Sequence, residues 1–111
     1  MTQTQEDINR IMKATRDLLI LKNKQYGDSA LNPIGVFGDS NPIVSLGARM
    51  DDKLMLLRGL SMNEGAIDTL YDLQGYLCLL IIAIERAENI ISTDHTIEDD
   101  SNTSTILNSE Q

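Results

Sequence analysis

The acidic side chains best placed to do chemistry stand together in the second half of the chain. Glu64, Asp68 and Asp72 follow one another at intervals of four residues, so in a helix they fall within about 80° of one another around the axis. Like charges at this spacing repel and favour a neighbouring cation. Mg²⁺ prefers carboxylate oxygens and completes its shell with water and substrate phosphates, so the spacing fits a magnesium site for a nucleotide. Judged by their spacing alone, the three acids are more readily explained as solvated side chains near a helix N-terminus, where the helix dipole favours negative charge.

Basic and aromatic side chains precede this acidic segment. Arg49 and Lys53 are also four residues apart. They could contact phosphate oxygens, although pairing with acids on a facing helix is the simpler interpretation. Lys22, Lys24 and Tyr26 close an earlier helical segment, where lysines are common for capping reasons. Tyr26 could lie at the edge of a core or stack on a base.

Composition places these residues in a small protein. The chain has 111 residues, with 9 Lys+Arg against 17 Asp+Glu and a formal net charge of -8, which disfavours binding to DNA or RNA through a basic surface. One cysteine permits no internal disulfide and no secretion signal opens the chain, so a cytoplasmic protein is expected, in the host cell if the source is viral. The longest apolar run, 77–84, has eight residues, whereas a membrane span needs about 20. The run is predicted to be core, and no membrane partner is expected.

Helical periodicity dominates residues 1–91. Apolar residues recur at every third or fourth position, which predicts an all-α fold with helices over 5–26, 42–59 and 62–91. Capping patterns that begin at Thr4, Asn41 and Ser61 mark the expected N-termini. The short link between the second and third helices predicts an antiparallel hairpin. The connection 27–41 is longer than most helix connections, and such loops are often functional.

The third predicted helix is apolar on every side in its middle, around Cys78 to Ala83. Two other helices in one chain do not suffice to cover it, so the bundle is predicted to be completed by homo-oligomerisation, most simply as a homodimer. Gly75 interrupts this helix at a cost of about 1 kcal/mol relative to alanine. It indicates close approach of another backbone, and a packed helix is favoured over a ligand.

The last residues of the chain differ from the rest. Residues 92–111 contain five acids and no Lys or Arg, and they are rich in Ser, Thr, Asn and Asp. With so few apolar side chains, burial cannot offset the entropy of ordering. The sequence therefore predicts an all-α ligand-binding domain over 1–91 and a disordered acidic tail over 92–111.

Three sequence blocks, taken in order, resemble a known family. They are LKNKQYGDSALNP at 21–33, ARMDDKLMLL at 48–57 and EGAIDTLYDLQGYLCLL at 64–80. Together they resemble the phage and bacterial family called nucleotide modification associated domain 1. That family is similar to the all-α nucleotide pyrophosphohydrolases of the MazG and dimeric dUTPase type.

The resemblance implies an all-α, usually oligomeric bundle that binds a nucleoside phosphate through Mg²⁺. By this resemblance, Asp68 and Asp72 match the family's acidic pair, and Glu64 is a third metal ligand. Tyr76 matches the family's helix tyrosine. The resemblance also assigns binding residues to the first block, Lys22 and Tyr26, and to the second block, Arg49 and Lys53. Catalytic members of the MazG-like group also carry a Glu-x-x-Glu on the preceding helix. Here the stretch 49–52 reads Arg-Met-Asp-Asp, so that pair of glutamates is absent.

Three functions fit these observations. Because a pyrophosphohydrolase normally needs about four carboxylates to balance its metal ions, the first hypothesis is a nucleotide-binding protein with a degenerate metal site. Such a protein would bind or sequester a nucleoside phosphate or a cyclic signalling nucleotide. The second is a Mg²⁺-dependent nucleoside triphosphate pyrophosphohydrolase that acts on a nucleotide pool, modified nucleotides included. The third is a helical interaction module whose acidic face and tail engage a basic protein.

Overall fold

The structure, a computed structural model, describes residues 1–92 and contains three helices and no strand in that part of the chain. The helices are α1 (Gln3–Tyr26), α2 (Pro42–Arg58) and α3 (Glu64–Glu88). The predicted all-α fold with three helices is therefore confirmed. The tail predicted over 92–111 lies, apart from Ser92, outside the described residues.

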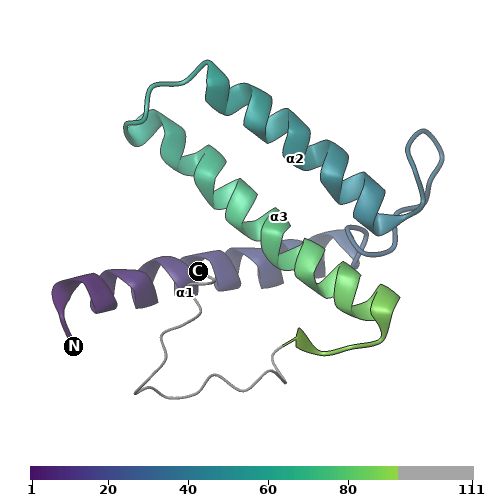
Figure 1. Ribbon diagram of the computed structural model, residues 1–111, viewed down its shortest axis with the longest axis horizontal. Coiled ribbons are helices and arrows are strands. Elements are labelled where there is room, and N and C mark those ends of the chain that lie inside the picture. Colours follow the sequence, from purple (N-terminus) through teal and green to yellow (C-terminus); the bar gives the residue numbers. More distant parts are fainter. Residues whose placement is uncertain (93–111) are drawn as a thin grey trace.

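The helices are arranged as a hairpin crossed by a single helix. Figure 1 shows α2 and α3 side by side and antiparallel, with α1 crossing α3. The packing of α2 against α3 is more extensive than that of α1 against α3. The connection between α1 and α2 includes a loop that projects beyond the helices (Figure 1).

The capping residues explain where the helices begin. Asn41 caps α2 as predicted, because its Oδ1 accepts a hydrogen bond from the Ile43 N–H at 2.9 Å. The predicted start of α1 is wrong by two residues, since α1 begins at Gln3. Thr2 and Gln5 form a reciprocal capping box there, with side-chain to backbone distances of 3.1 and 3.0 Å. Gln5, the third residue of the helix, completes this capping box, so the helix is capped by Thr2 and not by the predicted Thr4.

The predicted bounds of the third helix are also corrected. Asn63 rather than Ser61 caps α3, because the Asn63 Oδ1 accepts from the Gly65 N–H at 2.8 Å. The helix ends at Glu88 instead of 91, since Asn89 takes the left-handed conformation with φ 56° and terminates it. Both differences follow from asparagine, whose side chain caps N-termini and which tolerates positive φ better than most residues.

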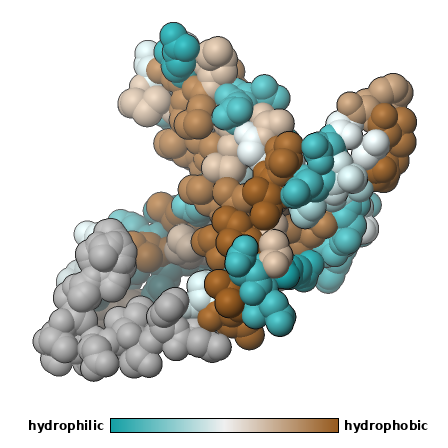
Figure 2. Space-filling model, turned by 45° about the vertical axis from the view of Figure 1, so that its right-hand side comes forward, coloured by the Kyte–Doolittle hydropathy of each residue, from teal (hydrophilic) through white to brown (hydrophobic). Residues whose placement is uncertain are grey.

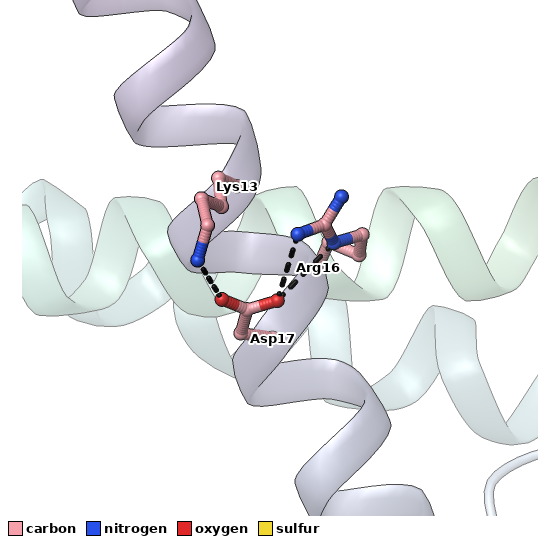
Figure 3. A network of polar contacts seen from close by, with 3 residues as sticks. All are labelled: Lys13, Arg16 and Asp17. Atoms are coloured by element: carbon pink, nitrogen blue, oxygen red, sulfur yellow. Dashed lines mark hydrogen bonds and ion pairs between the residues drawn. The ribbon is translucent and has the colours of Figure 1, made fainter.

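The outer surface of α1 carries a local ion network, shown in Figure 3. Asp17 accepts from the Lys13 Nζ at 2.7 Å and from the Arg16 Nε at 3.1 Å. Both hydrogen bonds lower the pKa of Asp17 below its ordinary value, and the bond from Lys13 has the larger effect. The network occupies three charged side chains along one exposed stretch of helix, so Lys13 and Arg16 already have a partner.

The buried core is small. Leu46 of α2 is the one large side chain that is fully buried among residues 1–92, and it clusters with Leu31 from the loop and Ala83 from α3. Half-buried apolar side chains pack around this cluster: Ala30, Ile43, Tyr76, Leu79, Leu80 and Ile82. Because Leu31 belongs to the cluster, the first part of the connection 27–41 is anchored to the helices.

The apolar run 77–84 is core on one side only. Ala83 is buried, whereas Leu77 and Ile81 remain about half exposed. By length and composition α3 would be able to cross a membrane, and 17% of its most apolar 18-residue window is buried in the structure. The cytoplasmic location therefore stays a prediction.

Leu46→Ala is expected to lower the free energy of unfolding by about 2–5 kcal/mol, because it leaves a cavity in the centre of the core. Urea unfolding followed by circular dichroism measures this change. Leu56→Ala is the matched control, since Leu56 lies on the same helix with 49% of its surface exposed. Equal destabilisation by the two substitutions would contradict the position of the core.

Candidate functional site

A pocket of about 320 Å³ lies between α1, α3 and the start of the loop that follows α1. Its wall combines charged, aromatic, polar and apolar side chains: Thr15, Leu18, Leu19, Lys22, Asn23, Tyr26, Ser29, Ala30, Arg49, Tyr71, Asp72, Gly75, Tyr76 and Leu79. Ligand-binding pockets typically measure about 300–1,000 Å³. This one is therefore large enough for a single small ligand.

The end of α1 and the turn after it form one side of the pocket. Lys22 and Tyr26 are one helical turn apart and both line the wall. Gly27 ends the helix in the left-handed conformation with φ 61°, which an L side chain rarely adopts. The Asp28 carboxylate then accepts from the Asn23 Nδ2 at 2.9 Å and from the Asn32 Nδ2 at 2.8 Å. These bonds fix the turn that brings the next residues back to the pocket.

The crossing of α1 over α3 forms the floor. A Cβ on Gly75 would lie 3.1 Å from the Leu19 Cδ2, so the missing side chain is what lets α1 sit against α3. A packed helix of the same chain thus approaches Gly75, as predicted, but it does so with the side chain of Leu19 and not with its backbone. One residue earlier, the Gln74 side-chain amide donates a hydrogen bond to the Thr15 hydroxyl. This bond and the Leu19 contact hold α1 in place along α3.

The hairpin contributes the remaining charges. Lys53 of α2 forms an ion pair with Asp72 of α3, with 3.0 Å between Nζ and Oδ2, and the two side chains are 29% and 31% exposed. The hydrogen bond to Asp72, followed by the charge of that carboxylate, raises the pKa of Lys53 above its ordinary value. Lys22 and Arg49, by contrast, form no ion pair with any residue of the described part. The pocket therefore carries two unpaired cations beside a carboxylate that already has its partner.

The structure brings together most of the binding residues expected from sequence. Lys22, Tyr26, Arg49, Asp72 and Tyr76 line the pocket, and Lys53 adjoins it through its ion pair with Asp72. Lys24 is not part of the wall, because two helical positions turn it about 200° away from Lys22.

Four polar lining residues were not anticipated: Thr15, Asn23, Ser29 and Tyr71. Tyr71 stands one turn before Gly75 on α3, and Asn23 follows Lys22 on α1. Both belong to the blocks that carry the family resemblance. Asn23 stands three positions before the predicted site residue Tyr26, and Tyr71 stands three positions after Asp68 and directly before Asp72. This proximity was the signal that could have identified them.

The three expected metal ligands do not form a cluster. Glu64 and Asp68 lie outside the pocket wall, and within residues 1–92 no group of three His, Cys, Asp or Glu side chains is placed to hold a metal ion. Asp72 directs one carboxylate oxygen to Lys53. The donor set of one chain thus does not fit a preformed three-carboxylate magnesium site, and magnesium remains a prediction from sequence.

Comparison of the chain with protein-family models, curated proteins and solved structures finds no match. The resemblance to nucleotide modification associated domain 1 therefore rests on the three sequence blocks. Each block supplies part of the pocket wall: Lys22 and Tyr26 from the first, Arg49 from the second, and Tyr71 and Tyr76 from the third.

Asp72→Asn is expected to lower the pKa of Lys53 toward the ordinary value of 10.5, because it removes the hydrogen-bonded negative charge. Since folding raises this pKa, the pair contributes its stability in full below about pH 10 and loses it as the pH rises through the folded pKa. NMR titration of the lysine side chains measures the shift. Asp51→Asn is the control, and equal Lys53 pKa values in both variants would show that the ion pair does not form.

Proposed function

We propose that the pocket between α1 and α3 binds a nucleotide. The observation that carries this proposal is the pair of unpaired cations, Lys22 and Arg49, in the wall of a pocket that also contains three tyrosines. The whole chain has a formal net charge of -8, whereas the wall of this pocket carries two cations and one acid, Asp72, that is already paired with Lys53. An anionic ligand satisfies that excess.

The phosphate group of the ligand is assigned to Lys22 and Arg49. A guanidinium presents its N–H groups as a fork that matches two phosphate oxygens, whereas a lysine ammonium acts as a point charge. The two side chains come from α1 and α2, so they approach a phosphate from different elements. Asp72 would repel the phosphate if its charge were free, but Lys53 balances it.

The base is assigned to the aromatic and apolar part of the wall. Tyr26 is 69% exposed at the edge of the pocket and offers a ring face for stacking, which is worth about 1–3 kcal/mol per base. Leu18, Leu19 and Leu79 supply apolar contacts. Asn23 donates to Asp28 through Nδ2, which leaves its Oδ1 to accept a hydrogen bond from a base.

Binding without turnover is the form of the proposal that the residues support. Hydrolysis of a pyrophosphate bond needs metal ions or a positioned base to activate water, and the acids Glu64 and Asp68 lie outside the pocket wall. We infer membership of the resembled nucleotide-binding family on the same ground, since all three of its blocks meet at this pocket. A protein that holds its nucleotide intact would act by sequestering it.

Lys22→Met and Arg49→Met are each expected to weaken nucleotide binding by about tenfold or more, because each removes a hydrogen bond to a charged group worth about 1.5–3 kcal/mol. Isothermal titration with a panel of ribonucleoside and deoxyribonucleoside monophosphates, triphosphates and cyclic dinucleotides measures the change. Lys24→Met is the matched control. It removes the same charge from the same helix, outside the pocket wall, and should leave the affinity unchanged.

The panel also separates the proposal from its alternatives. Equal weakening by Lys22→Met and Lys24→Met would show that the net charge of the chain, rather than the pocket, governs binding. A wild-type chain that binds no member of the panel would favour the protein-interaction hypothesis. Heat that continues after saturation, with release of pyrophosphate, would favour the hydrolase.

A further inference from the structure

The most acidic part of the chain follows the described helices. The segment 93–111, called the acidic segment below, contains five acids and no Lys or Arg. Residues 1–92 hold all nine basic residues together with twelve acids, so the formal charge is -5 for the acidic segment and -3 for everything before it. A segment of this charge is attracted to any group of cations within its reach and repelled by the rest of the surface.

The start of the acidic segment is held beside α3. After Asn89 ends the helix, Ser92 donates to the Glu85 Oε2, from its backbone N–H at 2.9 Å and also from its hydroxyl. Glu85 stands six positions after Leu79, which lines the pocket. At 1.5 Å per residue this is about 9 Å along the helix axis. The acidic segment therefore leaves from the part of α3 that adjoins the pocket.

The acids of the segment are within reach of the pocket. Glu98 is six residues beyond Ser92 and Asp100 is eight residues beyond it, which corresponds to about 20–28 Å of extended chain. A short flexible tether keeps its end at an effective concentration of about a millimolar. A contact that would be weak between separate molecules is therefore populated within one chain.

We propose that the acidic segment pairs with Lys22 and Arg49 in the ligand-free chain and competes with the phosphate group for them. This inference rests on the proposed function, because it concerns the regulation of the same pocket. Neither cation forms an ion pair within residues 1–92. A carboxylate matches the N–H fork of the Arg49 guanidinium in the same way as two phosphate oxygens do. The segment is thus an internal competitor that lowers the affinity of the pocket for anions.

The remaining surface of residues 1–92 attracts the acidic segment less. Arg86 lines a second pocket that contains no other Lys or Arg, whereas Lys24 and Arg58 line neither of the two pockets. Figure 2 shows that much of the middle of the molecule is hydrophobic surface, which offers no partner to a carboxylate. The pocket, by contrast, presents Lys22 and Arg49 together, from two helices. It is therefore the place where several acids of one segment find cations at once.

NMR of the full chain without nucleotide tests the contact. We expect the Nε–H signal of Arg49 to shift when Asp99→Asn and Asp100→Asn are combined, because its carboxylate partners are lost. The matched control combines Glu6→Gln with Glu88→Gln, which removes the same charge from exposed residues outside the pocket wall. An unchanged Arg49 signal in the tail variant would overturn the proposal, and so would an equal shift in both variants.

Isothermal titration of the same three chains with inorganic pyrophosphate measures the competition. Occupation of half the pockets by the acidic segment doubles the apparent dissociation constant of a ligand. We therefore expect the tail variant to bind pyrophosphate about twofold or more tightly than the wild-type chain and the control, with a difference that shrinks as salt is added. Equal affinity of all three chains would overturn the competition.

The two measurements fail separately from the proposed function. If no chain binds pyrophosphate while the Arg49 shift is confined to the tail variant, the contact is supported and the competition is overturned, together with phosphate binding. If pyrophosphate binds equally to all chains and the Arg49 signal never shifts, the pocket binds anions and the acidic segment has no part in it.

Discussion

The close crossing of α1 over α3 at Gly75 is the constraint on which the rest of the structure depends. Because Gly75 has no side chain, Leu19 packs directly against the α3 backbone, and the Gln74 to Thr15 hydrogen bond fixes the position of α1 along it. The next turns of α1 then carry Lys22 and Tyr26 to the pocket wall. A Cβ at position 75 would lie 3.1 Å from the Leu19 Cδ2, so the Leu19 side chain would have to shift to accommodate it.

Charge pairing determines what the pocket can accept. Asp72 and Lys53 balance each other at its edge, while Lys22 and Arg49 keep their charges available. The sequence left two roles open for Asp72, as metal ligand or as ion-pair partner, and the structure shows the ion pair. In the folded chain its Oδ2 lies 3.0 Å from the Lys53 Nζ. A phosphate that enters the pocket therefore meets two cations and a neutralised acid.

The sequence predicted the helices well because apolar spacing and capping residues act locally. Asn41 with Pro42 marked the start of α2, whereas Thr2 and Asn63 were missed because competing capping patterns lay two residues away. The pocket was harder to predict, since it depends on how separate helices meet. Lys22 and Lys24 look equivalent in sequence, and only the orientation of α1 on α3 separates them. Tyr71 was missed because its role depends on the same crossing.

Burial shows the limit of reasoning from one chain. The apolar middle of α3 was predicted to need more cover than two other helices provide, and in the described chain Leu77 and Ile81 remain about half exposed. The small core and the exposure of Leu77 and Ile81 have one physical cause. The hairpin partner α2 and the crossing helix α1 do not enclose α3 on every side. The pocket includes Asp72, Gly75 and Leu79 of α3 in its wall, whereas Leu77 and Ile81 of the same helix lie outside it and remain about half exposed.

Native mass spectrometry of the purified chain, incubated with a broad panel of linear and cyclic nucleotides, tests the central claim most directly. We expect one class of nucleotide to be retained on the protein and recovered chemically unaltered after denaturation. Retention of none of them would contradict the assignment of the pocket. Recovery of a monophosphate together with pyrophosphate would contradict binding without turnover.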